Sequence, residues 1–309
     1  MDFRAIFLAT IQTIGLYAAG FVIPIVGQVL ALFTPVPAII AWVRNGRREG
    51  LAVLCAASVL AFILGGWQAA AIYFFGFGLM ALGTAEGMRQ NLKAEQIALL
   101  GGLLPVVVIG TILSFYFIRI GKNPVIAVET YLRSGIANAA KLYTTMGLTE
   151  MSSAVTAVPD KFIHYLVRLI PGIAIATSVV QASFCYGIAR SAIARKQIPI
   201  SVDQPSFALW FAPDAWVWGL IAALALVVFP REVSRLIGWN LSIIFAVVYL
   251  AQGTAIVDFY LRKGRVRPFV RGLIIALILA LPAIVFVIAL GIVDIWADVR
   301  KVRGPVLKT

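Results

Sequence analysis

Residues 238–258 read GWNLSIIFAVVYLAQGTAIVD, an apolar stretch that carries Asn240 and Gln252 and ends on Asp258. As an α-helix rising about 1.5 Å per residue, this stretch is long enough to cross the ~30 Å hydrocarbon layer of a membrane. At helical spacing, one face gathers small and polar residues, among them Gln252 and Gly253. Because lipid cannot satisfy polar groups, we expect this face to turn toward other helices or toward a ligand.

The composition extends this interpretation to the whole chain. Of its 309 residues, 61% are hydrophobic and only 13% are charged, whereas soluble domains carry about 25% charged residues. The sequence therefore predicts an all-α polytopic transmembrane bundle of about eight or nine spans. We expect one integral membrane domain over residues 1–309, with N-terminal spans in 5–118 and C-terminal spans in 163–300.

Prolines and glycines indicate that several spans are kinked or broken. The sequence TPVP at 34–37 predicts two half-helices or one kinked span, and Pro171-Gly172 predicts a kink in a later helix. Gly65-Gly66 predicts the turn of a hairpin, and residues 272–293 are expected to form one last span. Residues 119–162 carry recurrent charges at helical spacing, which predicts one or two amphipathic helices lying at the membrane interface.

The net charge of +13 lies almost entirely in short connectors between the apolar runs. This pattern is typical of topology signals and of contact with anionic lipid headgroups, and membrane lipids are therefore expected partners. Nucleic acid is not an expected partner, because no soluble domain carries a basic face. His164 is the only histidine, and Cys55 and Cys185 both lie in apolar runs, so we expect neither a disulfide framework nor a cofactor.

Five residues are candidates for contact with a small-molecule ligand, because they place polar or aromatic groups within or beside apolar runs: Asn240, Gln252, Gly253, Arg168 and Trp210. An arginine at the centre of a membrane helix costs roughly 2.5–3.5 kcal/mol on insertion scales, so a buried Arg168 needs a partner. The alternatives are that Arg168 reaches the headgroups or pairs with Asp160, and that Trp210 anchors the chain at the membrane surface.

Asp294 and Asp298 are the one weak candidate for a metal site, because they stand one helical turn apart and could share a divalent cation. The alternative is that they pair with Arg300, Lys301 and nearby bases. No phosphate-binding glycine loop, zinc-protease motif or nucleophile elbow is present. The sequence therefore offers no support for an enzyme.

Several short motifs carry a resemblance to a known family. They are PIVGQVLALFTPVP at 24–37, PSFALWFAP at 205–213, GWNL at 238–241, AQGTAI at 251–256 and GIVDIWADVR at 291–300. Together they resemble the YybS-like family of bacterial multi-pass membrane proteins. The positions that match its recurrent pattern are Trp210, Pro213, Asn240, Gln252, Gly253, Asp294, Asp298 and Arg300. The resemblance implies a bacterial inner-membrane location and a fold similar to the substrate-binding S components of energy-coupling-factor transporters, but no established biochemical role.

Three functions are compatible with these observations. The first is a small-molecule-binding or transport-related component, with a cavity between the 238–261 helix, the TPVP segment and the Pro171-Gly172 helix. The second is a non-catalytic assembly or scaffold protein of the cell envelope, whose small and polar face would bind the helices of a membrane protein partner. The third is a metal-dependent membrane transferase built on Asp294 and Asp298.

Overall fold

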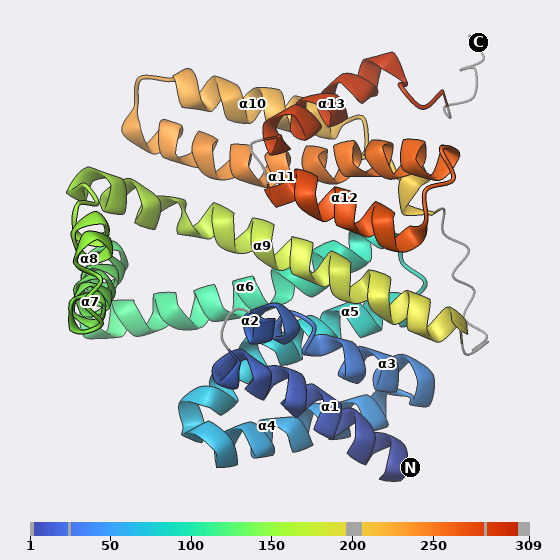
Figure 1. Ribbon diagram of the computed structural model, residues 1–309, viewed down its shortest axis with the longest axis horizontal. Coiled ribbons are helices and arrows are strands. Elements are labelled where there is room, and N and C mark those ends of the chain that lie inside the picture. Colours follow the sequence, from blue (N-terminus) through green and yellow to red (C-terminus); the bar gives the residue numbers. More distant parts are fainter. Residues whose placement is uncertain (1–2, 24–25, 196–205, 281–282, 302–309) are drawn as a thin grey trace. The chain divides into compact units, whose positions relative to one another are not determined.

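The computed structural model describes residues 3–23, 26–195, 206–280 and 283–301, and these residues are almost entirely helical (Figure 1). The chain divides into two compact units, Met1–Val202 and Asp203–Thr309. Six helical segments are long and apolar enough to cross a membrane, and three shorter apolar helices accompany them in the second unit. The protein is therefore a polytopic helical membrane protein, as predicted.

The first unit contains nine α-helices and one π-helical segment among the described residues. They are α1 (Phe3–Val22), α2 (Val26–Ala31), α3 (Pro35–Asn45), α4 (Arg47–Ala71), η1 (Ile72–Gly78, the π-helix), α5 (Leu79–Arg89), α6 (Ala94–Ile120), α7 (Pro124–Thr145), α8 (Thr149–Thr156) and α9 (Asp160–Arg195).

The TPVP segment breaks the second apolar run into two half-helices, which is one of the two alternatives that the sequence predicted. Helix α2 ends at Ala31, and α3 begins with Pro35 in its first turn, where the missing proline N–H leaves no helical bond unmade. The chain also leaves helical geometry at Gly65 and Gly66, the predicted turn, and Gly66 has a φ of 73° that favours glycine. Both breaks thus follow from residues visible in the sequence.

Helices α6 and α9 lie side by side through the first unit (Figure 1). Their close approach depends on Gly102, because a Cβ there would stand 2.6 Å from the Cα of Val179. Ser178 adds a hydrogen bond across the same contact by donating to the Gly102 carbonyl at 2.8 Å. Helix α9 continues as a single helix through Pro171 and Gly172.

Helices α7 and α8 occupy the stretch for which the sequence predicted one or two amphipathic helices. Figure 1 shows them almost end-on beside the ends of α6 and α9, which lie across the view, so they run across these long helices and not along them. In α7 only Ala140 is buried, and in α8 no residue is. This arrangement agrees with helices that lie along a membrane surface, although their depth stays a prediction.

The second unit is organised around its longest helix, α11 (Glu232–Lys263). The other described elements of this unit are the short 3-10 helix η2 (Phe207–Leu209), α10 (Trp216–Val228), α12 (Pro268–Ala280) and α13 (Ile284–Ala297). Helices α10 and α13 both pack on α11. Gly238 allows the first contact, because a Cβ there would meet the carbonyl oxygen of Ala223 at 2.7 Å.

The prediction of one last span over 272–293 was wrong. Two helices, α12 and α13, occupy this stretch, and each has only 13 or 14 residues. At about 1.5 Å per residue, neither reaches across a ~30 Å hydrocarbon layer. Pro282, which the sequence placed inside the span, lies outside the described residues. Among its described residues, the second unit therefore combines one long α-helix with three short ones.

Candidate functional site

The end of α13 brings two charged residues together. The helix ends where Asp298 adopts a left-handed conformation, with a φ of 38°, which aspartate tolerates better than most residues. The chain then turns back, so that the Val299 amide donates to the Asp294 Oδ1 atom at 2.8 Å. This turn brings the Arg300 side chain into the protein interior, next to the end of α13.

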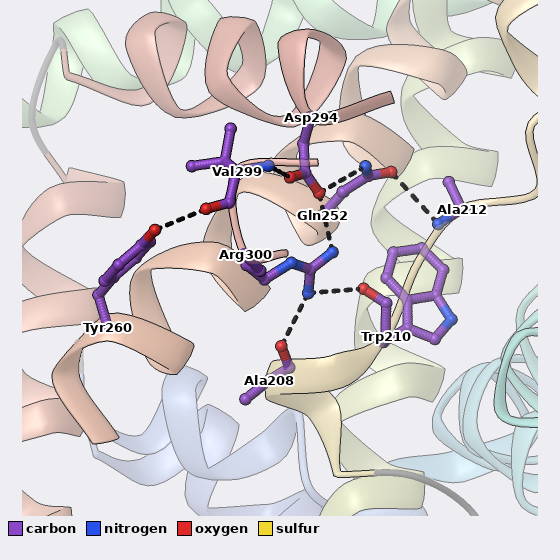
Figure 2. A network of polar contacts seen from close by, with 8 residues as sticks. All are labelled: Ala208, Trp210, Ala212, Gln252, Tyr260, Asp294, Val299 and Arg300. Atoms are coloured by element: carbon purple, nitrogen blue, oxygen red, sulfur yellow. Dashed lines mark hydrogen bonds and ion pairs between the residues drawn. The ribbon is translucent and has the colours of Figure 1, made fainter. Parts of the chain in front are cut away.

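Arg300 and Asp294 form a fully buried ion pair. Arg300 Nη2 donates to Asp294 Oδ2 at 2.9 Å, and both side chains have an exposed fraction of 0%. Gln252 on α11, equally buried, donates through Nε2 to the same Oδ2 at 3.2 Å. We call these three side chains the polar cluster (Figure 2). Charges that are removed from water need partners of this kind.

The polar cluster holds residues 206–215, a segment without α-helix that contains η2 and that we call the cover. Arg300 Nη1 donates to the carbonyls of Ala208 at 2.7 Å and Trp210 at 3.0 Å, and the Ala212 amide donates to Gln252 Oε1 at 3.2 Å (Figure 2). Irregular backbone has unpaired polar groups, which protein must satisfy at membrane depth. All three bonds reach backbone atoms of the cover, so they do not depend on its side chains.

Two aromatic residues complete the surroundings. The Arg300 guanidinium lies over the Phe211 ring, 3.8 Å from its centroid, which is a cation–π geometry. Tyr260 on α11 donates to the Val299 carbonyl at 2.6 Å and fastens the turn that follows α13 (Figure 2). The site is thus built from α11, the end of α13 and the cover.

Two buried polar groups in this region have no hydrogen-bond partner among the described residues. They are the Nε atom of Arg300 and the hydroxyl of Tyr249, a residue with an exposed fraction of 0%. Tyr249 belongs to a core cluster with Ala212 and Leu220, against which Trp210 packs. Its phenol therefore lies in the core that the cover packs on, within the unit that holds the polar cluster.

The structure brings together some of the residues that the sequence singled out. Gln252 and Asp294 bond directly, and the backbone of Trp210 joins them through Arg300. For Asp294, the alternative of pairing with Arg300 is what the structure shows. Gly253 serves helix packing, because a Cβ there would stand 1.9 Å from the carbonyl oxygen of Val287.

Other candidates lie apart from the polar cluster. Asn240 stands twelve residues before Gln252 on α11, about 18 Å along the axis, and it donates to the Leu236 carbonyl of its own helix at 2.9 Å. Arg168 belongs to α9 in the other unit. Its suggested partner Asp160 forms an ion pair with Arg133 of α7. The cavity expected between segments of both units stays a prediction.

The carboxylates of Asp294 and Asp298 differ in their surroundings. Asp294 already accepts from Arg300, Gln252 and Val299. Asp298 lies in the left-handed position just beyond α13 and is half-buried. Within the described residues, no group of three or more His, Cys, Asp or Glu side chains could hold a metal ion.

Sequence reasoning included Arg300 only as a pattern position and as a partner for Asp294, not as a ligand-contact candidate. The available signal was an arginine six residues after an aspartate, at the end of an apolar helix. The hydrogen bond from Arg300 to the Ala208 carbonyl could not be predicted, because a sequence does not show which backbone atoms form tertiary contacts.

Comparison with known families agrees with this architecture. A family model described as "Predicted membrane protein (DUF2232)" matches residues 11–295. The chain belongs to this family. No curated protein and no solved structure matches the chain. The match assigns the chain to a family of membrane proteins. The likeness to transporter S components stays a prediction.

Proposed function

We propose that this protein is a small-molecule-binding, transport-related component of the bacterial inner membrane, with its binding centre at the polar cluster of Gln252, Asp294 and Arg300. The observation that carries the proposal is the fully buried Arg300–Asp294 pair, which is bonded to the backbone of the cover. Replacing a buried pair by apolar residues is often neutral or stabilising, so stability alone is a poor reason to keep one. Ionisable residues within membrane proteins are typical of substrate and ion pathways.

The way the cover is held supports a route to the binding centre. Its described bonds to the polar cluster join the Ala208 and Trp210 carbonyls and the Ala212 amide to two side chains. A ligand with hydrogen-bonding groups would replace these bonds one for one as the cover lifts. Short, interrupted helices such as α12 and α13 are also a recurrent feature of transporter binding sites, where they leave backbone groups for substrate.

A ligand panel tests the proposal. The purified protein in lipid nanodiscs is mixed with neutral amides and heterocycles, carboxylates, amines and sugars, and its unfolding temperature is followed by tryptophan fluorescence. A bound ligand stabilises the folded state by mass action. We expect at least one chemical class to raise the unfolding temperature of the wild type.

A matched pair of variants localises the effect. Gln252→Leu removes two bonds of the polar cluster, whereas Asn240→Leu makes the same kind of change elsewhere on α11. The ligand-induced rise should persist in Asn240→Leu and disappear in Gln252→Leu. An unchanged rise in a folded Gln252→Leu, or no rise for any class with the wild type, contradicts the proposal.

A second candidate function is a scaffold that binds partner helices, and α12 favours it. None of the residues 268–278, whose side chains are described, is buried, and Leu273 and Leu277 have exposed fractions of 60% and 58%. A photocrosslinker at Leu273 in intact membranes tests this function. A single discrete protein adduct, absent when the crosslinker is moved to Leu224 of α10, supports it, and adducts with lipid alone reject it.

A further inference from the structure

The turn between α11 and α12 carries a dense positive charge. Residues 262–271 read RKGRVRPFVR, with five basic residues and no acidic one, and we call this stretch the basic corner. It directly follows the apolar part of α11, which is long and apolar enough to cross a membrane. Basic residues at the end of such a helix lie where the chain leaves the hydrocarbon layer, at the level of the lipid headgroups.

The basic corner has a defined shape. The amide of Val266 donates to the Leu261 carbonyl at 3.0 Å and closes the end of α11. Arg262 Nε donates to the Oδ2 atom of Asp258 at 2.9 Å, and Arg271 Nε pairs with the Oδ1 atom at 2.7 Å. The buried Asp258 carboxylate thus joins α11 to the first turn of α12, and the chain doubles back between the two helices (Figure 1).

The charge of the basic corner is far from balanced. Asp258 offsets only one of its five positive charges. Lys263, Arg265 and Arg267 are exposed, and none of the acidic side chains that the structure describes forms an ion pair with them. An excess of exposed positive charge at headgroup level attracts anionic lipid.

An apolar stripe begins at the same corner. Phe269, Leu273 and Leu277 follow one another at four-residue intervals on α12, which places them on one side of the helix. Their exposed fractions are 83%, 60% and 58%. A water-soluble anion would leave this stripe uncovered, whereas the acyl chains of a lipid would cover it. The charged corner and the apolar stripe together match the headgroup and the chains of a phospholipid.

We infer that the basic corner binds the phosphate of an anionic phospholipid, whose acyl chains lie along the apolar stripe of α12. The three unbalanced cations attract the phosphate, and the bridge through Asp258 holds α12 where its stripe receives the chains. The site is separate from the polar cluster, and it does not depend on the proposed function. The phospholipid competes for α12 with the partner helices of the second candidate function.

The binding of single lipids tests this inference. The protein in a neutral detergent is titrated with phosphatidylglycerol or with phosphatidylcholine of the same acyl chains, and native mass spectrometry counts the bound molecules. One basic residue near anionic lipid contributes about a factor of five in affinity. The wild type should therefore bind its first phosphatidylglycerol at least about tenfold more tightly than phosphatidylcholine. Glycerol 3-phosphate, which lacks acyl chains, should not displace phosphatidylglycerol at equal concentration.

A triple variant localises the binding. Lys263→Gln, Arg265→Gly and Arg267→Gln together remove the three unbalanced charges and should lower the affinity for phosphatidylglycerol at least about fivefold. Arg265 has a φ of 55°, in the left-handed region that favours glycine, so the glycine at this position does not strain the fold.

The matched control removes the same charge from the other unit. Arg44→Gln, Arg48→Gln and Arg89→Gln replace three exposed basic residues of the first unit. This control variant should keep the wild-type preference for phosphatidylglycerol, because the basic corner is intact.

Each outcome decides the matter. The inference is overturned by a wild type without the preference, by equal losses in the two triple variants, or by displacement of the lipid by glycerol 3-phosphate. If the basic-corner triple variant does not fold, Arg265→Gly alone decides, with an expected loss of about fivefold and an unchanged affinity as the contrary result.

A photocrosslinker at Leu273 in intact membranes gives a second measurement. Its adducts should be enriched in anionic phospholipid relative to those formed at Leu224 of α10, which is also exposed. Equal lipid adducts at the two positions, or a discrete protein adduct at Leu273 in place of lipid, overturn the inference.

Discussion

Gly253 of α11 lies directly against the backbone of Val287 of α13, so that an added Cβ would stand 1.9 Å from the Val287 carbonyl oxygen. The same crossing is close on the other side, where a Cβ at Gly291 would stand 2.0 Å from the Tyr249 carbonyl oxygen. Small residues let two membrane helices touch through their backbones. This contact places Gln252 within hydrogen-bond distance of a residue on α13 and is the basis of the polar cluster.

Gly253→Ala should therefore weaken the second unit. The added methyl group forces α11 and α13 apart, and overpacking of this kind costs typically about 1–3 kcal/mol. Gly272→Ala on α12 is the control, because a Cβ there meets nothing within 4 Å, and alanine is the better helix former by about 1 kcal/mol. Unfolding in mixed micelles with increasing sodium dodecyl sulfate measures both. Equal free energies of unfolding for the two variants would show that Gly253 is not needed for the close contact between α11 and α13.

The buried ion pair should behave as a unit in a double-mutant cycle. Arg300→Met alone leaves Asp294 charged and buried, which costs about 3–5 kcal/mol, and Asp294→Leu alone leaves Arg300 in the same condition. The double variant should lose clearly less than the sum of the two, because each substitution removes the other's uncompensated charge. Free energies of unfolding measure the coupling, and additive losses would show that the two residues do not depend on each other.

Much of the architecture was predictable because membrane helices have a distinctive, strongly apolar composition. Lipid exposure demands long apolar runs, and backbone breaks demand proline or glycine, so the helix over 238–261, the two half-helices around TPVP and the turn at Gly65-Gly66 all followed from the sequence. The last span was mispredicted for the same reason. Residues 272–293 are uniformly apolar, and composition cannot distinguish one long helix from two short ones.

The site was predictable only in part. Gln252 and Asp294 are polar residues in apolar surroundings, which is a local signal. That they meet each other, and that Asn240 on the same helix does not join them, depends on the register between α11 and α13, which Gly253 and Gly291 determine by contact. Arg300 reaches the cluster only because Asp298 turns the chain back. Tertiary contacts of this kind leave no pattern in one sequence.

The cover should open more readily when its hold on α11 is removed. In Gln252→Leu, the Ala212 amide loses the oxygen to which it donates at 3.2 Å. Its hydrogen exchange should accelerate, because exchange reports local opening. Hydrogen–deuterium exchange with mass spectrometry on the peptide covering 206–215 measures the change. Asn240→Leu should leave that peptide unchanged, and equal exchange in the wild type and Gln252→Leu would mean that other contacts hold the cover.

Helix α7 should lie along the membrane surface and not across the membrane. Its 22 residues would reach about 33 Å, enough to span, so length alone does not decide. The charged residues of α7 decide the question. Glu129 pairs with His164 and Arg133 pairs with Asp160, and these groups need water or lipid headgroups close by. An interfacial helix lies at a nearly constant depth, about 5–10 Å into the headgroup boundary.

Spin labels along two helices measure that depth through their accessibility to oxygen and to a water-soluble nickel complex. Labels at Tyr131 and Leu142 of α7, both exposed and on the same face because they stand about three turns apart, should report the same shallow depth. Labels at Val107 and Phe115 of α6, also exposed, should differ from each other, because α6 is long and apolar enough to cross the hydrocarbon layer and Val107 stands at its middle. A clearly greater depth at Tyr131, toward the middle of α7, than at Leu142 near its end would show that this helix spans the membrane.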